Sequence, residues 1–326
     1  MKSPSQVTRW TSVVNMYETH FEPILGQWTV DAVNAAQTKV QSMLSTYGSR
    51  EETPQACDAT PLTVVDVGCG LGAMTLAFAE RFLASAEEKA VAPVRIVASD
   101  IWPDMLTHLE QRIESPRYER FAKQIETTVM DGQTLEPLAD GSVDVLMSSF
   151  GMTIFPDQDK TWSSAHRVLK KGGVLVATAW AVESDNVRWF DALATAAHEV
   201  STASAVADGS EPPALDLPST KLATDSNKLP TRLEKLGFSE VIAYKTSHSS
   251  VVPSGDELMD AMLQNPGVAA YLKVLGEERF RGVMLDLIKD SYNSVFSGET
   301  VSSNEKRNLV RPVIIQNAGY VVVATK

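Results

Sequence analysis

The spacing of hydrophobic and polar positions changes along the chain. Residues 5–47 place apolar side chains at helical spacing around Pro23, and Gly48 follows as a helix stop. From Leu62 to Trp180, short apolar runs rich in β-branched residues alternate with amphipathic segments. This alternation predicts a parallel sheet with right-handed crossovers and with helices on both faces.

Five strands are predicted in the alternating region. In chain order they are LTVVDVG, VRIVASD, IETTVMDG, VDVLMSSFG and VLVATAW. Amphipathic helices are predicted between them, and the helix DKTWSSAHRVLKK is expected to close at Gly172 and Gly173. The sequence thus predicts an α/β fold of the doubly wound kind.

The regular alternation of predicted strands and helices ends after Trp180. NVRWFDALATAAHEV predicts a helix, and residues 201–229 are rich in Ala, Ser, Thr and Pro, as is typical of a long loop. A short helix and the strand SEVIAYKTSHS follow, residues 254–309 are mainly helical, and PVIIQNAGYVVVATK ends the chain as a strand. A final strand that returns by a hairpin-like excursion would be antiparallel, which gives a seven-stranded sheet.

Composition narrows the class of protein. The 326 residues are 44% apolar and 21% charged, which is normal for a globular protein, and the net charge is −12. This acidity argues against a nucleic-acid partner. No apolar run is long enough for a membrane span and no leader is visible, so a cytoplasmic location is expected. Cys57 and Cys69 form neither a disulfide framework nor a metal site. The oligomeric state is left open.

The stretch VVDVGCGLGAM, Val64 to Met74, fits two cofactor loops. Gly68, Gly70 and Ala73 match the dinucleotide fingerprint G-x-G-x-x-G/A. The same stretch matches D-x-G-x-G-x-G, a loop that binds S-adenosylmethionine (SAM), through Asp66 and the glycines at 68, 70 and 72. In either case glycines allow backbone amides to approach the ligand closely.

Carboxylates at the ends of three strands favour SAM. Asp66 lies where a dinucleotide fold usually has an apolar residue, and its charge would attract the sulfonium and ammonium groups of SAM but repel a pyrophosphate. Asp100 can accept the ribose hydroxyls, and Ile101 can cover one face of adenine. Asp131 can accept the adenine amino group. Parallel strands end at one edge of a sheet, where such folds bind ligands.

Several motifs together resemble the class I SAM-dependent methyltransferases. They are VVDVGCGLG, ASDIWPDML, MDGQTLEPLADGSVDVLMSSFG, HRVLKKGGVLVATAW and GYVVVATK. The segment SFGMTIFPDQDKTWSSAHRVLKKGG is most similar to the ubiquinone/menaquinone-biosynthesis branch. That branch carries Arg-Asn where this chain has Thr153 and Ile154. The resemblance implies a Rossmann-like sheet of seven strands whose last strand is antiparallel.

The resemblance also implies the cofactor site, position by position. The implied cofactor-binding residues are Asp66, Gly68, Gly70, Gly72, Asp100, Ile101, Met130, Asp131, Gly132, Ser148, Ser149 and Phe150. The glycines would pass under the methionine part, and Asp100 would hold the ribose. Asp131, flanked by Met130 and Gly132, would read adenine, while the residues from Ser148 to Phe150 would line the methionine end.

The remaining segments are expected to build the acceptor site. We expect a helical lid at 1–50, a SAM-binding core at 51–250 with a loop at 201–229, a helical insertion at 251–310, and a core strand at 311–326. The loop could gate the pocket. Candidates for substrate contact are Tyr17, His20, Trp28 and Trp180, and candidates for a catalytic role are His20, Tyr17 and His248.

The predicted activity is transfer of a methyl group to oxygen or nitrogen of a small-molecule metabolite, by in-line displacement. One alternative is a C-methyltransferase acting on a quinone-like ring, against which the missing Arg-Asn pair counts. Two others are an NAD(P)-binding oxidoreductase and a non-methylating protein on a related fold.

Overall fold

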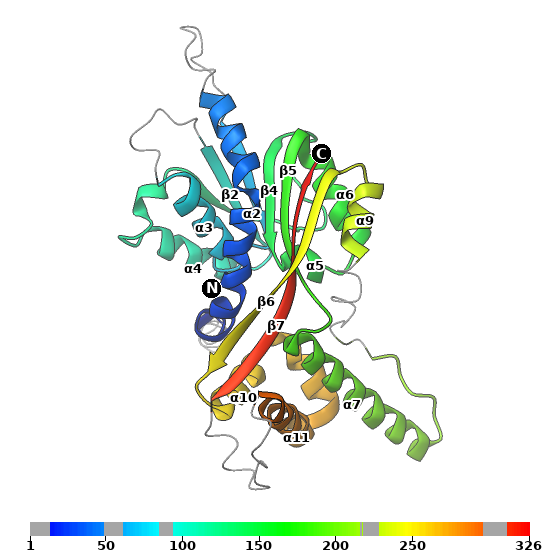
Figure 1. Ribbon diagram of the computed structural model, residues 1–326. Helices are drawn as coiled ribbons and strands as arrows, with labels where there is room; N and C mark the ends of the chain where they lie inside the picture. Colours follow the sequence, from blue (N-terminus) through cyan, green and yellow to red (C-terminus); the bar gives the residue numbers. More distant parts are fainter. Residues whose placement is uncertain (1–13, 49–60, 85–93, 216, 218–227, 296–311) are drawn as a thin grey trace, which may run out of the picture. The chain divides into compact units, whose positions relative to one another are not determined.

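The computed structural model describes residues 14–48, 61–84, 94–215, 217, 228–295 and 312–326. Seven strands form one sheet in the order β3-β2-β1-β4-β5-β7-β6 (Figure 1). The strands are β1 (Leu62–Val67), β2 (Val94–Asp100), β3 (Ile125–Val129), β4 (Val143–Ser149), β5 (Leu169–Trp180), β6 (Ser239–Val252) and β7 (Val313–Thr325). Five strands therefore come from the alternating region, as predicted, and two from the last third of the chain.

Helices connect these strands. They are the π-helix η1 (Tyr17–Phe21), α2 (Glu22–Gly48), α3 (Ala73–Phe82), α4 (Pro103–Ile113), the 3-10 turn η4 (Glu119–Phe121), α5 (Gly151–Ile154), α6 (Gln158–Val168), α7 (Asp185–Asp208), α9 (Leu229–Lys235), α10 (Gly255–Gln264), η6 (Pro266–Val268) and α11 (Ala269–Val295). None of the helices described is both long and apolar enough to cross a bilayer.

The strand directions agree with the prediction. Strands β1, β2, β3, β4 and β5 pair in parallel. At the start of β5, the amide of Gly172 donates to the carbonyl of Lys326, and the amide of Lys326 donates to the carbonyl of Gly173. This reciprocal exchange is the pattern of an antiparallel pair. The expected α/β fold, with a seven-stranded sheet whose last strand is antiparallel, is thus confirmed.

The chain divides into two compact units. Unit 2 comprises residues 25–179, 225–246 and 319–326, and unit 1 comprises residues 1–24, 180–224 and 247–318. The strand ends that carry the predicted cofactor residues all belong to unit 2. The predicted boundaries of a lid, a core and an insertion stay a prediction.

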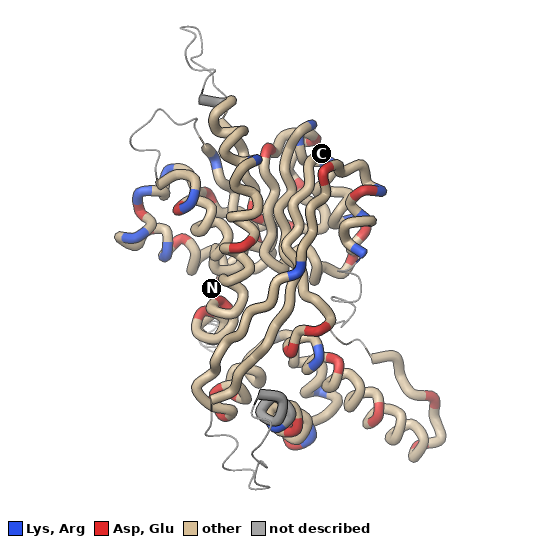
Figure 2. Tube along the Cα trace, in the orientation of Figure 1, with Lys and Arg blue, Asp and Glu red and all other residues tan. Residues whose placement is uncertain are grey.

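The central strands β1, β4 and β5 of unit 2 are buried on both faces. On one face, Val65 and Val67 of β1 share an apolar cluster with Trp162 and Ala165 of α6. On the other face, Asp66 points towards α3 and contacts Thr75 there. Strands that are covered on both sides are expected to read as continuous apolar runs, as these do. Figure 2 shows few charges on these strands and charges of both signs on the flanking helices.

One predicted helix end was wrong. Helix α6 ends at Val168, and Lys170 to Gly173 belong to β5 instead of closing the helix. Val143 and Val145 of β4 pair with Leu169 and Val174, so four residues of β5 stand opposite one of β4. This irregularity is larger than an ordinary β-bulge, in which two residues stand opposite one. The ion pair of Lys170 Nζ with Asp144 Oδ2, at 2.7 Å, and the pairing with Lys326 hold these residues in the sheet.

The predicted loop at 201–229 also begins later. Helix α7 continues through STASAVAD to Asp208, because alanine favours helix, and it ends at Gly209 with φ of 65°. Strand β6 extends to Val252, beyond the predicted strand. The predictions for residues 1–13, 49–60, 85–93, 216, 218–227 and 296–311 concern parts of the chain outside the described residues.

Unit 1 has its own apolar core. Helices α7, α10 and α11 supply most of it, including the fully buried Leu193, Tyr271 and Phe280. Burial raises the pKa of the Tyr271 phenol to about 12, and the nearby Asp191 carboxylate adds to the shift. Tyr271 therefore stays neutral at physiological pH and acts as a core residue of this unit.

Candidate cofactor site

The carboxyl ends of four neighbouring strands meet at one edge of the sheet. Val67 of β1 pairs with Ser99 of β2, and Asp100 pairs with Val129 of β3. Asp66 pairs with Met147 of β4, so Ser148 follows in the next row. The predicted cofactor residues of these strands are therefore neighbours in space, where parallel sheets bind ligands.

The glycine loop joins β1 to α3. Gly68, Gly70 and Gly72 all have positive φ, at 66°, 54° and 82°, a backbone conformation that other residues rarely adopt. A Cβ on Gly72 would also lie 2.2 Å from Cδ1 of Leu109. Arg112 of α4 fixes the loop, because its Nη1 donates to the carbonyl of Leu71 at 2.9 Å.

Asp66 lies buried beneath this loop. Its side chain is fully buried, and Oδ2 accepts a hydrogen bond of 2.6 Å from the Thr75 hydroxyl. Within the described part of the chain, Oδ1 has no hydrogen-bond partner. Burial raises the pKa of this carboxyl to about 7; bonds from Thr75 oppose the shift and the Asp100 carboxylate adds to it. The group is therefore poised between its two charge states near neutral pH.

Asp100 braces the loop from the end of β2. Its Oδ2 accepts from the amide of Gly70 and its Oδ1 from the amide of Trp102, both at 2.9 Å. Burial raises the pKa of Asp100, and these backbone bonds oppose the shift. Each oxygen retains lone pairs for a further donor. Ile101, which follows, is 56% exposed and presents an apolar surface beside this carboxylate.

Asp131 starts the segment between β3 and β4. Its Oδ1 accepts from the amide of Gln133 at 2.9 Å and from the Gln133 side-chain amide at 3.2 Å. Met130 before it is buried, and its amide donates to the carbonyl of Asp100. Gly132 after it lies against the ring of Phe155, since a Cβ on Gly132 would meet Cε2 of Phe155 at 2.3 Å.

The end of β4 closes against the glycine loop. The Ser148 hydroxyl donates to the carbonyl of Val67 at 2.7 Å and accepts from the amide of Met152 at 3.0 Å. A Cβ on Gly151 would lie 3.0 Å from both Ser148 Oγ and Val67 O, so glycine permits this approach. Ser148 therefore acts in the structure as a tie between β1, β4 and α5.

Phe150 adopts a strained backbone. Its φ is 60°, and its amide donates to the Thr178 hydroxyl at 2.9 Å. Such a φ is uncommon for a bulky residue and tends to occur at functional sites. The Phe150 ring is buried and packs edge-on against Trp28, with centroids 5.8 Å apart. Ser149 beside it shares a hydrogen bond of 3.1 Å with the hydroxyl of Thr29.

The acceptor candidates fall into both units. Trp28 is fully buried in unit 2 against Phe150 and Gly319, whereas Trp180 ends β5 and is assigned to unit 1. Tyr17 and His20 lie in η1, where Tyr17 stacks on Phe21 at 6.0 Å. His248 lies in the part of β6 that belongs to unit 1. The roles of these residues stay predictions.

Three further side chains, which the sequence analysis did not identify, contact the predicted cofactor residues. Thr75 bonds Asp66, Gln133 bonds Asp131, and Phe155 packs on Gly68 and Gly132. Only Gln133 had a local signal, because an aspartate often bonds the backbone amide two residues later. Thr75 and Phe155 are brought to the site by tertiary structure.

Comparisons with known proteins agree with this geometry. Residues 65–177 match the family described as a methyltransferase domain. The chain is 31% identical over 116 residues to a 2-methoxy-6-polyprenyl-1,4-benzoquinol methylase of Schizosaccharomyces pombe, covering 35% of this chain and 36% of that protein. It is 32% identical over 129 residues to a demethylmenaquinone methyltransferase of Deinococcus radiodurans, covering 39% and 46%. The chain thus spans less than half the length of either relative.

Among solved structures, the YcgJ protein of Bacillus subtilis superposes with a TM-score of 0.50 at 14% identity. The match covers 82% of this chain and 92% of that protein, and it supports the fold. The family match covers the glycine loop and all three carboxylates. Residues 65–177 therefore form a class I, SAM-dependent methyltransferase domain.

Proposed function

We propose that this protein transfers the methyl group of SAM to an oxygen or nitrogen atom of a small-molecule acceptor. The carrying observation is the set of three carboxylates, Asp66, Asp100 and Asp131, at the ends of adjacent strands around a glycine loop. Such a set suits a ligand with positive charge and many donors, and it disfavours a pyrophosphate.

Each residue of the site has a proposed role. The amides of the glycine loop approach the methionine part, with the Asp66 carboxylate below it as counter-charge. Asp100 accepts the ribose hydroxyls, Ile101 covers adenine, and Asp131 accepts its amino group. Met130 and Gly132 shape the adenine pocket, and Ser148, Ser149 and Phe150 shape the methionine end. Asp66 Oδ1, which has no hydrogen-bond partner among the residues that the structure describes, fits a ligand of this kind.

The chain contributes mainly alignment. SAM supplies a methyl group on a positively charged sulfur, from which a nucleophile displaces it in line. Alignment of the reactants can lower a barrier by roughly 7–11 kcal/mol in ideal systems, so rigid strand ends suit the reaction. A hydroxyl acceptor also needs a base, for which His20, Tyr17 and His248 are the candidates. An amine acceptor needs only to be deprotonated.

The acceptor site and the charge of the acceptor are proposed from the segments outside the cofactor core and from the net charge of the chain. Residues 1–50, 181–229 and 251–310 lie outside the strands and helices that hold the cofactor candidates, and they are proposed to form the acceptor site. The net charge of −12 favours a neutral or cationic acceptor over an anionic one. No nucleic acid is proposed as a partner.

A second candidate activity is C-methylation of a quinone-like ring. Two relatives are a benzoquinol methylase and a demethylmenaquinone methyltransferase, which favours it. Against it, Thr153 and Ile154 replace the Arg-Asn pair of that branch. The Thr153 hydroxyl donates to the carbonyl of Phe150, and Ile154 is an exposed apolar residue, so neither supplies a charged group.

Two linked experiments test the proposal. Calorimetric titration should show binding of SAM, and Asp100→Asn should weaken it roughly tenfold. Asp159→Asn, which changes an exposed carboxylate of α6, should not. Incubation of a metabolite extract with methyl-labelled SAM should then give one labelled product, whose labelled atom mass spectrometry and NMR identify. Binding of NAD(P)H alone, or the absence of any labelled product, would overturn the proposal. A label on carbon would establish the second candidate instead.

A further inference from the structure

We propose that Gln133 is a positioning residue that sets the selectivity of the cofactor site for an amino-purine base. The proposal rests on the proposed role of Asp131 as the acceptor of the adenine amino group. Gln133 would act through Asp131, by fixing the direction in which its carboxylate points.

The orientation of the Gln133 side-chain amide is determined by its two neighbours. Its Oε1 accepts a hydrogen bond of 2.9 Å from the backbone amide of Asp157. A backbone N–H can only donate, so the oxygen must face it. The Nε2 group must then face Asp131, whose carboxylate can only accept when ionised.

The two oxygens of Asp131 are consequently unlike. Oδ1 accepts two bonds from Gln133, one from its backbone amide at 2.9 Å and one from Nε2 at 3.2 Å. Oδ2 lies 3.5 Å from Nε2, at the limit of a hydrogen bond. Since Oδ1 is fixed from two directions, Oδ2 is the oxygen best able to accept a ligand N–H.

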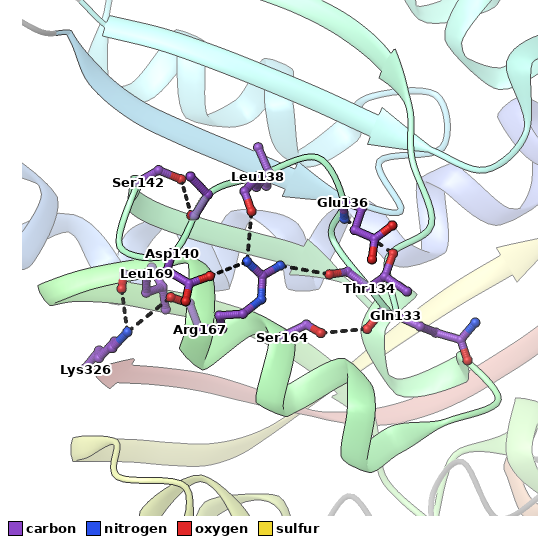
Figure 3. A network of polar contacts seen from close by, with 11 residues as sticks. Gln133, Thr134, Glu136, Leu138, Asp140, Ser142, Ser164, Arg167, Leu169 and Lys326 are labelled. Carbon is purple, nitrogen blue, oxygen red and sulfur yellow. Dashed lines mark hydrogen bonds and ion pairs between the residues drawn. The ribbon is translucent and has the colours of Figure 1, made fainter.

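Helix α6 holds the segment that carries Gln133. The Ser164 hydroxyl donates to the carbonyl of Gln133 at 2.8 Å (Figure 3). The Arg167 guanidinium donates to the carbonyls of Thr134 and Leu138, at 3.0 and 2.9 Å, and pairs with Asp140 at 2.7 Å. Together with the bond from the Asp157 amide, the segment after β3 is therefore bonded by three residues at or within α6, namely Asp157, Ser164 and Arg167. A rigid helix thus sets the position of Gln133.

The inference predicts a change in base preference when the donor is removed. The probes are S-adenosylhomocysteine and S-inosylhomocysteine, which carries an oxo group in place of the adenine amino group. Wild-type protein should prefer the adenosyl compound in calorimetry. Gln133→Glu keeps the size and an acceptor for the Asp157 amide but puts a carboxylate beside Asp131. In this variant, the ratio of the dissociation constants of the inosyl and adenosyl compounds should be about three- to tenfold smaller than in wild type.

Two further variants separate selectivity from folding. Ser164→Ala removes a backbone anchor but leaves the contact between Gln133 and Asp131 intact, so both dissociation constants should change by the same factor. Asp131→Asn should abolish the preference, and thermal unfolding checks that each variant is folded. An unchanged preference in Gln133→Glu, while Asp131→Asn loses it, would overturn the role of Gln133 alone. A wild-type protein without any preference, or an Asp131→Asn variant that retains it, would overturn the role of Asp131 and this inference together.

Discussion

At the scale of single residues, several side chains of the candidate site hold the backbone in place through hydrogen bonds. Asp100 accepts two backbone amides, and Ser148 ties two strand ends to a helix. Asp66 differs, because among the described residues Thr75 alone bonds its Oδ2, and burial is the largest influence on its pKa. Mutations of Asp66, Asp100 or Ser148 should therefore change both the free energy of unfolding and the affinity for the cofactor.

Asp66 should make the stability of the protein depend on pH. Its pKa is about 7 in the folded protein and roughly 3.9 in an unfolded chain. The folded protein thus holds a proton that the unfolded chain releases between about pH 4 and pH 7. The free energy of unfolding should fall as the pH rises through this window and level off above it. Asp66→Asn removes this pH dependence. The free energy of unfolding of the variant, relative to that of wild type, should therefore increase by up to about 4 kcal/mol from pH 4 to pH 8.

Denaturant unfolding of both proteins without ligand, at several pH values, measures this difference. Thr75→Val is the matched variant, because it removes a hydrogen bond that favours the ionised carboxyl. Thr75→Val should raise the pKa of Asp66 in the folded protein, so the fall in the free energy of unfolding should continue to a higher pH than in wild type. Parallel pH profiles for wild type and Asp66→Asn would show that the buried carboxyl is not the cause.

Gly132 should be intolerant of even one methyl group. A Cβ there would lie 2.3 Å from the Phe155 ring and 2.8 Å from Val67 Cγ1. Gly132→Ala should destabilise the protein by about 1–3 kcal/mol through overpacking. Gly26→Ala is the control, because no atom lies within 4 Å of its Cβ position in α2 and alanine favours helix. Equal unfolding free energies for the two variants would contradict the contact; combining Gly132→Ala with Phe155→Leu should restore part of the loss.

At the scale of elements, the pattern of the sequence predicted the five strands of the core and their parallel direction, but not their order in the sheet and not every boundary. Alternation from Leu62 to Trp180 specified the five parallel strands because strand and helix periods differ. It failed at Lys170 to Gly173, where a glycine pair after a basic run is also typical of a helix end. The bulge there depends on Asp144 and Lys326, far apart in sequence. The strand-end carboxylates were predictable in the same way, whereas their partners Thr75 and Phe155 depend on packing.

Helix α6 should be sensitive at its first turn. Asp157 caps it, because its Oδ1 accepts from the amide of Lys160 at 2.9 Å. Asp157→Ala should lower the free energy of unfolding by about 0.5–2 kcal/mol. Asp159→Ala, two residues on, removes an exposed ion pair with Arg232 and a carboxylate of the first helical turn, and should cost less than about 1 kcal/mol. Denaturant titration compares them, and an equal loss in both variants would argue against a specific capping effect.

At the scale of the whole molecule, 113 of 326 residues match the methyltransferase family, and the structure divides into two units. The proposed cofactor site lies in unit 2, so ligand binding there should stabilise that unit by mass action. S-adenosylhomocysteine at one hundred times its dissociation constant should add about 2.7 kcal/mol. Differential scanning calorimetry should show a raised unfolding temperature with this ligand and none with NADP⁺. A shift with NADP⁺ alone would contradict the assigned cofactor.

In the proposed site, the buried carboxyl of Asp66 should also make the number of bound protons depend on the ligand. A sulfonium favours the ionised carboxylate, whereas the thioether left after methyl transfer carries no such charge. With a pKa of about 7, the carboxyl is expected to release a proton when SAM binds and to regain one when the product forms. The site would then keep a nearly constant net charge through turnover. Calorimetry of SAM binding near pH 7, in buffers of different ionisation enthalpy, should give heats that depend on the buffer. Asp66→Asn should reduce this dependence, and an equal dependence in both proteins would exclude Asp66 as the group that exchanges the proton.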